Sequence, residues 1–284
     1  MIISYVHTCH VSDKSLEQLK EILHSMKRVA IAYSGGVDSA LLLRVAKDSL
    51  LEEIIAIVNV SPLNSADDVD NAIMVARSMN IEPLITYSNP LNDPYFRSNP
   101  IDRCYYCKKS MLNAIINMAK DRGIECVIEG SHRDDLDCDR PGNRAIAELG
   151  VRSPLREVGL DKKGVRRLAK KLSIPSADRP SSPCLITRIP FNQEVSEEAL
   201  KTVEKAESAL KELGFEEVRV RHHGTIARIE VPRNDMIRLI NLYDKVVEKL
   251  NRTGFIYVTV DLQGIRSGSM SEALASNTNR HNDV

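Results

Sequence analysis

Residues 34–39, SGGVDS, have the composition of an anion-binding loop. They follow an apolar run typical of a buried strand and precede a helical pattern, so paired glycines and the free N–H groups of a helix start would meet. Asp38 would repel a bare phosphate, which indicates a bridging Mg²⁺. The string matches neither GxxxxGK[ST] nor GxGxxG, and a plain Gly-Gly turn is the alternative. The candidate ATP ligands are Ser34, Gly35, Gly36, Val37, Asp38 and Ser39.

Three cysteines stand in settings that favour chemistry. Cys104 and Cys107 are three residues apart at a predicted helix start, where the helix dipole and the neighbouring Arg103 and Lys108 favour thiolates. Cys184 lies in a Pro-rich stretch. A C-x-x-C pair fits half a zinc site, a redox dithiol or part of an iron–sulfur site. Three thiolates on a 4Fe-4S cluster would leave one iron open for sulfide; alternatively, Cys184 is an unrelated thiol.

The first 170 residues alternate between strand and helix patterns. Strands are predicted at 27–33, 53–60, 82–87 and 125–129, and helices at 37–49, 66–79, 107–121 and 162–172. Short apolar strands that alternate with helices indicate an α/β fold, with a mostly parallel sheet covered on both faces.

From residue 173 the pattern changes to a Pro-rich stretch and then an α+β order. A helix is predicted at 196–213, with Ser196 as N-cap and Gly214 just after its end. Strands at 217–221 and 226–231, a helix at 235–250 and a strand at 255–260 follow. We therefore divide the chain into an α/β domain (1–180), a smaller α+β C-terminal domain (181–270) and a disordered tail (271–284).

Polar residues follow the predicted strands at the edge where open α/β sheets bind ligands. Glu129 and Asp134 are candidate Mg²⁺ ligands, with helix capping as the alternative for Asp134. Ser61 is the natural adenosine contact. Lys108 could reach phosphate oxygens or a carboxylate; alternatively, it faces solvent. Asp135 and Arg140 are further candidates, for Mg²⁺ and phosphate.

Composition excludes several classes of protein. Lys plus Arg and Asp plus Glu are both 39, so the formal net charge is zero, without the basic excess of a nucleic-acid binder. The longest aliphatic run, 54–60, is far shorter than the ~20 residues of a membrane span. The N-terminus lacks a signal-peptide pattern, and six cysteines are too few for a disulfide scaffold. We expect a cytoplasmic protein without a membrane or nucleic-acid partner.

With these pieces placed, SGGVDS resembles the PP-loop of the ATP pyrophosphatase superfamily, whose domain is Rossmann-like. The chain as a whole is similar to the LarE family of ATP-dependent sulfurtransferases. The resemblance runs through SGGVDS, RCYYCK, EGSHRDDLDCDRPG, SPLREVGLDKKGVRRLA, PCLITRIP, LGFEEVRVRHHGTIARIEV and GFIYVTVDLQGIRSGSM. It implies that Gly130 belongs to the ATP site. It also implies ATP cleavage to AMP and pyrophosphate, and conversion of the carboxylates of pyridinium-3,5-biscarboxylic acid mononucleotide to thiocarboxylates during nickel-pincer nucleotide synthesis.

The resemblance also separates two kinds of member. Some sacrifice the sulfur of the cysteine that corresponds to Cys184; others carry three cysteines and use an iron–sulfur cluster. Because Cys104, Cys107 and Cys184 occupy the three corresponding positions, we assign this chain to the second kind, with ATP, Mg²⁺ and a 4Fe-4S cluster as cofactors. The sulfur donor stays open, and the resemblance implies a homo-oligomer such as a hexamer. The alternatives are the sacrificial route, a PP-loop tRNA thiolation enzyme and a non-catalytic ATP-sensing module.

Arginines of the predicted hairpin are candidates for the phosphate of that mononucleotide. Arg219 and Arg221 share one face of their strand. If Gly224 forms a two-residue turn with His223, Arg219 lies opposite Arg228, and opposed like charges favour an anion between them. The alternative is a solvated basic face partly balanced by an acidic neighbour. Arg188, four residues after the linker cysteine, is placed in the same pocket.

Overall fold

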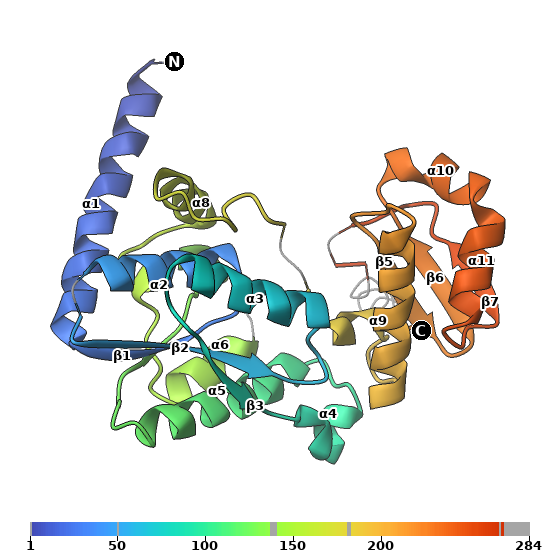
Figure 1. Ribbon diagram of the computed structural model, residues 1–284, viewed down its shortest axis with the longest axis horizontal. Coiled ribbons are helices and arrows are strands. Elements are labelled where there is room, and N and C mark those ends of the chain that lie inside the picture. Colours follow the sequence, from blue (N-terminus) through green and yellow to red (C-terminus); the bar gives the residue numbers. More distant parts are fainter. Residues whose placement is uncertain (1, 50, 137–140, 181–182, 267, 270–284) are drawn as a thin grey trace, which may run out of the picture. The chain divides into compact units, whose positions relative to one another are not determined.

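The computed structural model describes residues 2–49, 51–136, 141–180, 183–266 and 268–269, with side chains from residue 14 onward. The chain forms two compact units, whose elements Figure 1 labels. The first unit comprises residues 1–90 and 102–182, and the second comprises residues 91–101 and 183–284. Arg140 and the tail 271–284, both considered above, lie outside the described residues, as does Cys138.

A four-stranded parallel sheet forms the centre of the first unit. Its order is β3-β2-β1-β4, with bounds β1 Arg28–Ala32, β2 Glu53–Val60, β3 Leu84–Tyr87 and β4 Val127–Ile128. Ala30 of β1 is level with Ile55 of β2 and with Val127 of β4. Each strand lies within its predicted range, so the predicted parallel α/β sheet is confirmed. All four strands end at one edge, which we call the carboxyl edge.

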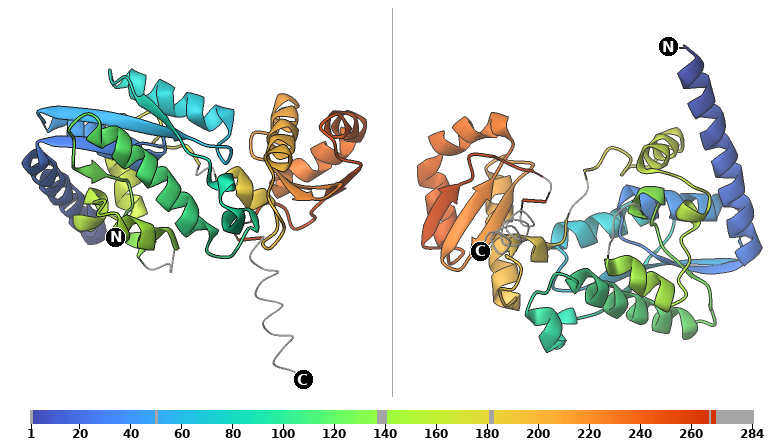
Figure 2. Two further views of the ribbon diagram at one scale, coloured as in Figure 1. Left: turned by 90° about the horizontal axis from the view of Figure 1, so that it is seen from below. Right: turned by 180° about the vertical axis from the view of Figure 1, so that it is seen from behind.

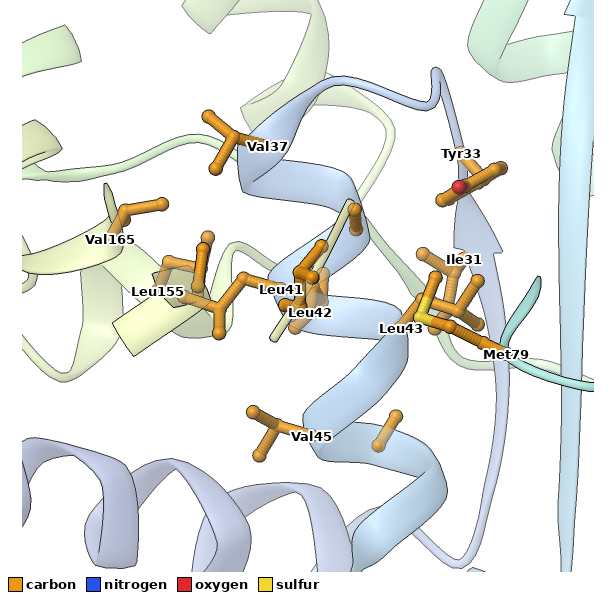
Figure 3. Close-up of a cluster of buried hydrophobic side chains, with 14 of the residues drawn as sticks. Ile31, Tyr33, Val37, Leu41, Leu42, Leu43, Val45, Met79, Leu155 and Val165 are labelled. Carbon is orange, nitrogen blue, oxygen red and sulfur yellow. The ribbon is translucent and has the colours of Figure 1, made fainter. Parts of the chain in front are cut away.

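Helices cover both faces of this sheet (Figures 1 and 2). They are α1 Ile2–Met26, α2 Val37–Asp48, α3 Ala66–Ser78, α5 Arg103–Lys120, α6 Pro141–Glu148, α7 Pro154–Glu157 and α8 Lys162–Lys171, with the 3₁₀ turn η2 Arg133–Asp135. Because strand side chains alternate between faces, Ile31 packs with α1, α2, α7 and α8, whereas Ala30 packs with α5 and α6. Figure 3 shows the first of these cores, which contains Leu41, Leu155 and Val165. The sequence analysis did not predict α1.

The second unit contains a short segment from the middle of the first. Residues 91–101, which the sequence analysis placed in domain 1–180, carry part of η1 Pro90–Asn92 and all of α4 Pro94–Arg97. Backbone hydrogen bonds join Val195 N–H to the carbonyl of Arg97, and the buried Asn99 side chain donates to the carbonyl of Pro190. The segment is thus tied to the chain that follows residue 183.

A three-stranded sheet organises the remainder of the second unit. Its order is β5-β6-β7, with bounds β5 Arg219–His223, β6 Ile226–Glu230 and β7 Tyr257–Val260. β5 and β6 are antiparallel, and β7 runs parallel to β6. The other elements are η3 Leu185–Arg188, α9 Glu197–Glu212, η4 Arg233–Asp235, α10 Met236–Asn241 and α11 Tyr243–Asn251. As predicted, Ser196 caps α9, and Gly214 follows it with a φ of +87°.

The helix predicted at 235–250 is wrong as a single element. α10 ends at Asn241 and α11 begins at Tyr243, because the backbone of Leu242 leaves helical values, with φ −100° and ψ 18°. The apolar spacing still places Leu239, Val246 and Leu250 in one core. The hydrophobic period could therefore not reveal the break.

Candidate functional site

The SGGVDS string forms the link between β1 and α2 at the carboxyl edge. Gly36 is the N-cap of α2, so Asp38 lies in its first turn. The hydroxyl of Ser39 donates to the carbonyl of Gly36 at 3.1 Å, and the N–H of Ser34 donates to that hydroxyl at 3.2 Å. The loop therefore folds back on the helix start, where N–H groups and the dipole favour an anion.

Two glycines allow this loop to be closely packed on both sides. Gly35 has a φ of +72°, and a Cβ there would lie 2.5 Å from the Cα of Ala72 in α3. Gly130 directly follows Glu129 after β4, and a Cβ there would lie 2.9 Å from the backbone nitrogen of Ser39. The loop is held between α3 and the end of β4, so side chains at these two positions would force it apart.

Ser61 ends the neighbouring strand at the same edge. It directly follows β2, and its N–H and hydroxyl both donate to the Asn64 side-chain oxygen, at 2.9 and 3.0 Å. Tyr33, the last residue before the loop, is buried, and burial raises the pKa of its hydroxyl above the usual range. Parallel strands thus bring Ser61 and the loop to one edge, as the sequence predicts.

Asp38 pairs with a lysine that the sequence analysis did not select. The ammonium nitrogen of Lys162 donates to Oδ1 and Oδ2 of Asp38, at 2.8 and 2.6 Å. Both side chains are partly exposed, 32% for Lys162 and 25% for Asp38. Lys162 is the first residue of α8, where a cation opposes the helix dipole. A lysine at this unfavourable helix position is a signal by which Lys162 could have been selected from the sequence.

The start of α8 is joined to the loop that follows β4. Asp134 Oδ2 accepts the N–H of Lys162 at 2.9 Å, and the N–H of Arg133 donates to the carbonyl of Leu160 at 2.8 Å. The Arg133 guanidinium also donates to Asp161, the N-cap of α8. Asp134 therefore caps a helix, the alternative considered for it, and it fixes the backbone of Lys162 beside Asp38.

Glu129 and Lys108 form a second carboxylate–ammonium pair, more deeply placed. Lys108 donates to Oε2 of Glu129 at 3.1 Å, and the hydroxyls of Ser131 and Ser153 also donate to this carboxylate. Burial acts to raise the pKa of Glu129, but Lys108 and the serine hydrogen bonds together lower it below the ordinary value. Because the protein already engages both oxygens of Glu129, its position suits orienting Lys108.

The two clustered cysteines lie in the first two turns of α5. The helix begins at Arg103, four residues earlier than predicted, so Cys104 is its second residue. Cys104 is exposed and Cys107 half-buried, and side chains three apart are neighbours on a helix surface. They belong to the first unit, whereas the exposed Cys184 belongs to the second. Cys126 is partly buried and packs against the core of the first unit, and burial raises the pKa of its thiol.

The hairpin register differs from the one considered above. The turn consists of Gly224 and Thr225, because His223 pairs with Ile226. Gly224 has a φ of +63°, which suits the first position of a two-residue turn. Arg221 therefore lies opposite Arg228, and Arg219 lies opposite Glu230. The turn lies one residue later than in the predicted hairpin, so the predicted pairing of Arg219 with Arg228 is wrong.

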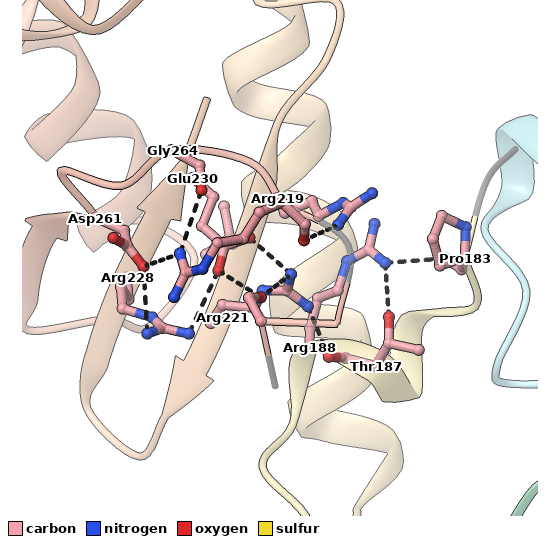
Figure 4. Close-up of polar contacts among 12 residues, drawn as sticks. Pro183, Thr187, Arg188, Arg219, Arg221, Arg228, Glu230, Asp261 and Gly264 are labelled. Atoms are coloured by element: carbon pink, nitrogen blue, oxygen red, sulfur yellow. Dashed lines mark hydrogen bonds and ion pairs between the residues drawn. The ribbon is translucent and has the colours of Figure 1, made fainter. Parts of the chain in front are cut away.

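Carboxylates of the second unit already meet most of its arginines (Figure 4). Glu230, fully buried, accepts from Arg221 at 2.7 Å and from Arg228 at 3.3 Å. Arg228 also pairs with Asp261. The sequence analysis allowed for an acidic neighbour, Glu230, that partly balances the arginine charges, but no local pattern indicated Asp261. Opposed arginines here are bridged from within the protein.

Arg188 connects the Cys184 segment to the core of the second unit. Its guanidinium forms two hydrogen bonds with the buried Glu207 of α9, at 2.7 and 3.1 Å, and donates to the carbonyl of Pro183 at 2.9 Å. Arg221 donates to the carbonyl of Thr187, whose own N–H donates to that of Cys184. These contacts fix the backbone on both sides of the cysteine.

Arg219 differs from the other three arginines. Among the described residues no carboxylate pairs with it, and its guanidinium donates to the carbonyl of Arg266 at 3.4 Å. Burial and then the positive charges of Arg221 and Arg188 lower the pKa of its guanidinium. The carboxylates of Glu230 and Glu217 act in the opposite direction but do not overcome these effects, so Arg219 is a half-buried cation that an anion would stabilise.

Within the described residues, His, Cys, Asp and Glu side chains do not gather in threes that could hold a metal ion. Of the helices in the described part of the chain, none combines the length and apolar character needed to cross a bilayer.

Comparison with known proteins gives three relatives of similar length, while no family model matches the chain. An uncharacterised protein of Synechocystis sp. is 36% identical over 92% of this chain and 98% of its own length. The pyridinium-3,5-bisthiocarboxylic acid mononucleotide synthase of Lactiplantibacillus plantarum is 35% identical over 89% of this chain and 92% of its own length. An uncharacterised protein of Methanocaldococcus jannaschii is 33% identical over 89% of this chain and 98% of its own length.

Proposed function

Because this chain belongs to the LarE family, we propose that it is a sulfurtransferase that makes pyridinium-3,5-bisthiocarboxylic acid mononucleotide from the biscarboxylic acid. The observation that most supports this proposal is the SGGVDS loop, which presents Asp38 and the start of α2 at the carboxyl edge. A phosphate loop there suits a reaction that uses ATP to activate a carboxylate.

The chemistry requires a better leaving group on the substrate. A carboxylate resists acyl substitution because its leaving group would be oxide. Attack of the carboxylate on the α-phosphorus of ATP forms an acyl-adenylate and releases pyrophosphate; a sulfur nucleophile then displaces AMP. The N–H groups at the start of α2 and the hydroxyl of Ser34 would hold the departing phosphates, while the Ser39 hydroxyl, which donates to the carbonyl of Gly36, would support the loop.

Mg²⁺ fits the donor set at the edge. Asp38 offers a partly exposed carboxylate at the phosphate loop, and Asp134 has one oxygen engaged by Lys162 N–H and is itself partly exposed. Hard oxygen ligands of this kind, together with phosphate oxygens, are what Mg²⁺ prefers. When bound, Mg²⁺ would supply neutralisation of phosphate charge. Glu129 would act differently, by holding Lys108 for a phosphate or substrate carboxylate.

The sulfur is proposed to come through Cys104, Cys107 and Cys184. The first two thiols are neighbours at the start of α5, and the third is exposed on a segment fixed by Arg188. Three thiolates are the right donors for a 4Fe-4S cluster. When bound, the cluster would supply an iron position for sulfide, without consuming a protein sulfur.

Arg219 is proposed as the main contact of this unit for the substrate phosphate. Arg188 and Arg221 were equal candidates from the sequence, but both are buried and engaged by Glu207 and Glu230. Arg219 alone of the set has no carboxylate partner in the described part of the chain, and its pKa is lowered by burial and positive neighbours. Arg219→Ala should raise the substrate dissociation constant about ten- to a hundredfold, the loss of one charge-assisted contact.

The adenylation step is tested by counting products. Purified protein with ATP, Mg²⁺, the biscarboxylic acid mononucleotide and sulfide should release AMP and pyrophosphate in equal amounts. Asp38→Ala should lower this turnover on the order of a hundredfold while the circular dichroism spectrum is retained. Release of ADP and phosphate instead would overturn the proposal.

The sulfur route is tested by anaerobic reconstitution with iron and sulfide. Cys104→Ala, Cys107→Ala and Cys184→Ala should each lose the visible absorbance of the cluster, whereas Cys126→Ala, outside the proposed set, should keep it. If Cys184→Ala keeps a full cluster and wild-type Cys184 loses the mass of one sulfur after turnover, the sacrificial route operates instead.

A further inference from the structure

We propose that Asn99 is a positioning residue for the three cysteines, because its buried side chain ties the stretch that leads into Cys104 to the stretch that follows Cys184. The inference rests on the proposed function, since it takes these cysteines as one set. Asn99 precedes Cys104 by five residues, and Pro190 follows Cys184 by six residues. The hydrogen bond between Asn99 and Pro190 therefore joins the two cysteine-bearing stretches of the chain.

The tie consists of the Asn99 side chain and its own backbone, all within the second unit. The amide nitrogen donates to the carbonyl of Pro190 at 2.7 Å and to that of Ile189 at 3.4 Å. The carbonyl of Asn99 accepts the N–H of Asn192 at 3.0 Å. Because Asn99 is fully buried, water cannot take the place of these partners, and losing the amide would leave buried carbonyl oxygens unsatisfied.

Asparagine suits this position for two reasons. The backbone of Asn99 has a φ of +59°, a left-handed conformation that asparagine and glycine adopt more readily than other residues. Its side chain meets two carbonyl groups, which only accept hydrogen bonds, so a donating amide is needed there. Aspartate has the same shape but would turn carboxylate oxygens toward both carbonyls. The residue type therefore matches both the backbone and the contacts.

The tie can act on the cysteines because the chain on each side of it is constrained. On the side of Cys104, Pro100 fixes its own φ, and α5 begins three residues later. On the side of Cys184, η3 follows directly, and its last residue, Arg188, is buried and paired with Glu207. Little slack is left between the tie and either cysteine.

The tie also shortens the path of chain between the thiols. Cys104 and Cys184 are 80 residues apart in the sequence. Through the Asn99–Pro190 bond the path is only the five residues before Cys104 and the six residues after Cys184. Effective concentration falls roughly as the −3/2 power of path length, so the shorter path raises the concentration of one thiol at the other by up to about twentyfold. Bringing the three cysteines together then costs less chain entropy.

The test measures how readily the two thiols meet when metal is absent. Metal-free Cys107→Ala protein is treated with a flexible bismaleimide, and the Cys104–Cys184 cross-link is followed by peptide mass spectrometry in chains that stay single on a denaturing gel. N99G keeps the left-handed backbone but removes the amide, so the cross-linking rate should fall about five- to twentyfold. N99D should slow it as well, because it cannot donate to the carbonyls. Unchanged rates in both variants would overturn the proposal.

Two controls separate positioning from stability. N192G changes another left-handed residue, which is exposed and keeps its N–H bond to the Asn99 carbonyl, so it should retain the parent rate. Val246→Ala opens a small cavity in the core of the second unit and should lower the urea midpoint of unfolding, yet it leaves the tie intact. In the absence of urea it should cross-link at the parent rate. If Val246→Ala slows cross-linking as much as N99G does, the effect is one of stability and the proposal is overturned.

A second arm follows the reconstituted cluster, and it shows which hypothesis has failed. With Cys107 restored, N99G should lose the visible absorbance of the cluster to EDTA several-fold faster than wild type and N192G. If the proteins with Asn99 intact give both the cross-link and the cluster, and N99G matches them, only this inference is overturned. If they give neither, the three cysteines are not one set, and the proposed sulfur route is wrong together with this inference.

Discussion

Two regions of this molecule use the same chemical groups for opposite purposes. At the carboxyl edge of the first unit, Lys162 meets Asp38 where both are partly exposed. In the second unit, Arg221 meets Glu230 at exposures of 3% and 0%. The distances are similar, 2.6 and 2.7 Å, so geometry does not distinguish the two pairs. Burial does.

The difference teaches how to separate a site from its scaffold. Removing one partner of a buried pair strands a charge in a low-dielectric interior, which costs about 3–5 kcal/mol. Removing one partner of a hydrated pair costs about 0–1 kcal/mol. Arginines that were candidate ligands in the sequence are therefore partly scaffold, whereas Lys162, which the sequence analysis did not select, lies at the phosphate loop.

The largest predicted effect is that of Glu230→Gln. This change leaves the buried Arg221 without its carboxylate partner, whereas Arg228 keeps Asp261, so the free energy of unfolding should fall by about 3–5 kcal/mol, measured by urea denaturation. Glu217→Gln removes an exposed charge two residues before β5 and is the matched control. Equal, small losses for both variants would break the comparison.

Glu129→Gln should give an intermediate effect. The carboxylate receives Lys108 and two serine hydroxyls, so its loss should cost about 1–3 kcal/mol at pH 7. Folding lowers the pKa of Glu129, with burial opposing and Lys108 and the serines producing the shift. Its contribution is therefore complete above the ordinary glutamate pKa of about 4.3 and is lost as pH falls through the folded-state value.

The measurement for Glu129 is the free energy of unfolding as a function of pH. The curve of Glu129→Gln should be flatter than that of wild type below the ordinary glutamate pKa. Glu125→Gln, at an exposed position four residues earlier, should follow the wild-type curve. Parallel wild-type and Glu129→Gln curves would show that this carboxylate is not paired in solution.

Local patterns predicted the elements well and the partners poorly. The apolar run at 53–60 predicted the bounds of β2 without error, and Ser196 predicted the start of α9. Both predictions succeed because an apolar strand and a helix N-cap depend on residues that are neighbours in the sequence. The hairpin register depended on which residue shares the turn with Gly224, which the alternation of side chains leaves undecided.

Long-range pairing explains what the sequence could not show. Asp38 and Lys162 are 124 residues apart, and Glu207 lies 19 residues after the arginine it neutralises. Nothing in their local patterns encodes these contacts. The segment 91–101 joined the second unit for a similar reason, since the hydrogen bonds of Asn99 reach residues 90 and 91 positions away. Composition and spacing located reactive groups, but only the fold shows which of them are already neutralised.

The smallest predicted effect is on the stability of the Asp38–Lys162 pair, and it is the one that most sharpens the comparison. D38N and K162Q should each change the free energy of unfolding by no more than about 1 kcal/mol, with a coupling energy of about 0.2–1 kcal/mol in a double-mutant cycle. The same variants should change the affinity for the uncleavable nucleotide α,β-methylene ATP far more. A coupling energy near 3 kcal/mol would instead place this pair with Arg221 and Glu230 as scaffold. A small coupling together with a large change in binding would mean that the pair is kept for its ligand, because stability alone would give no reason to retain it.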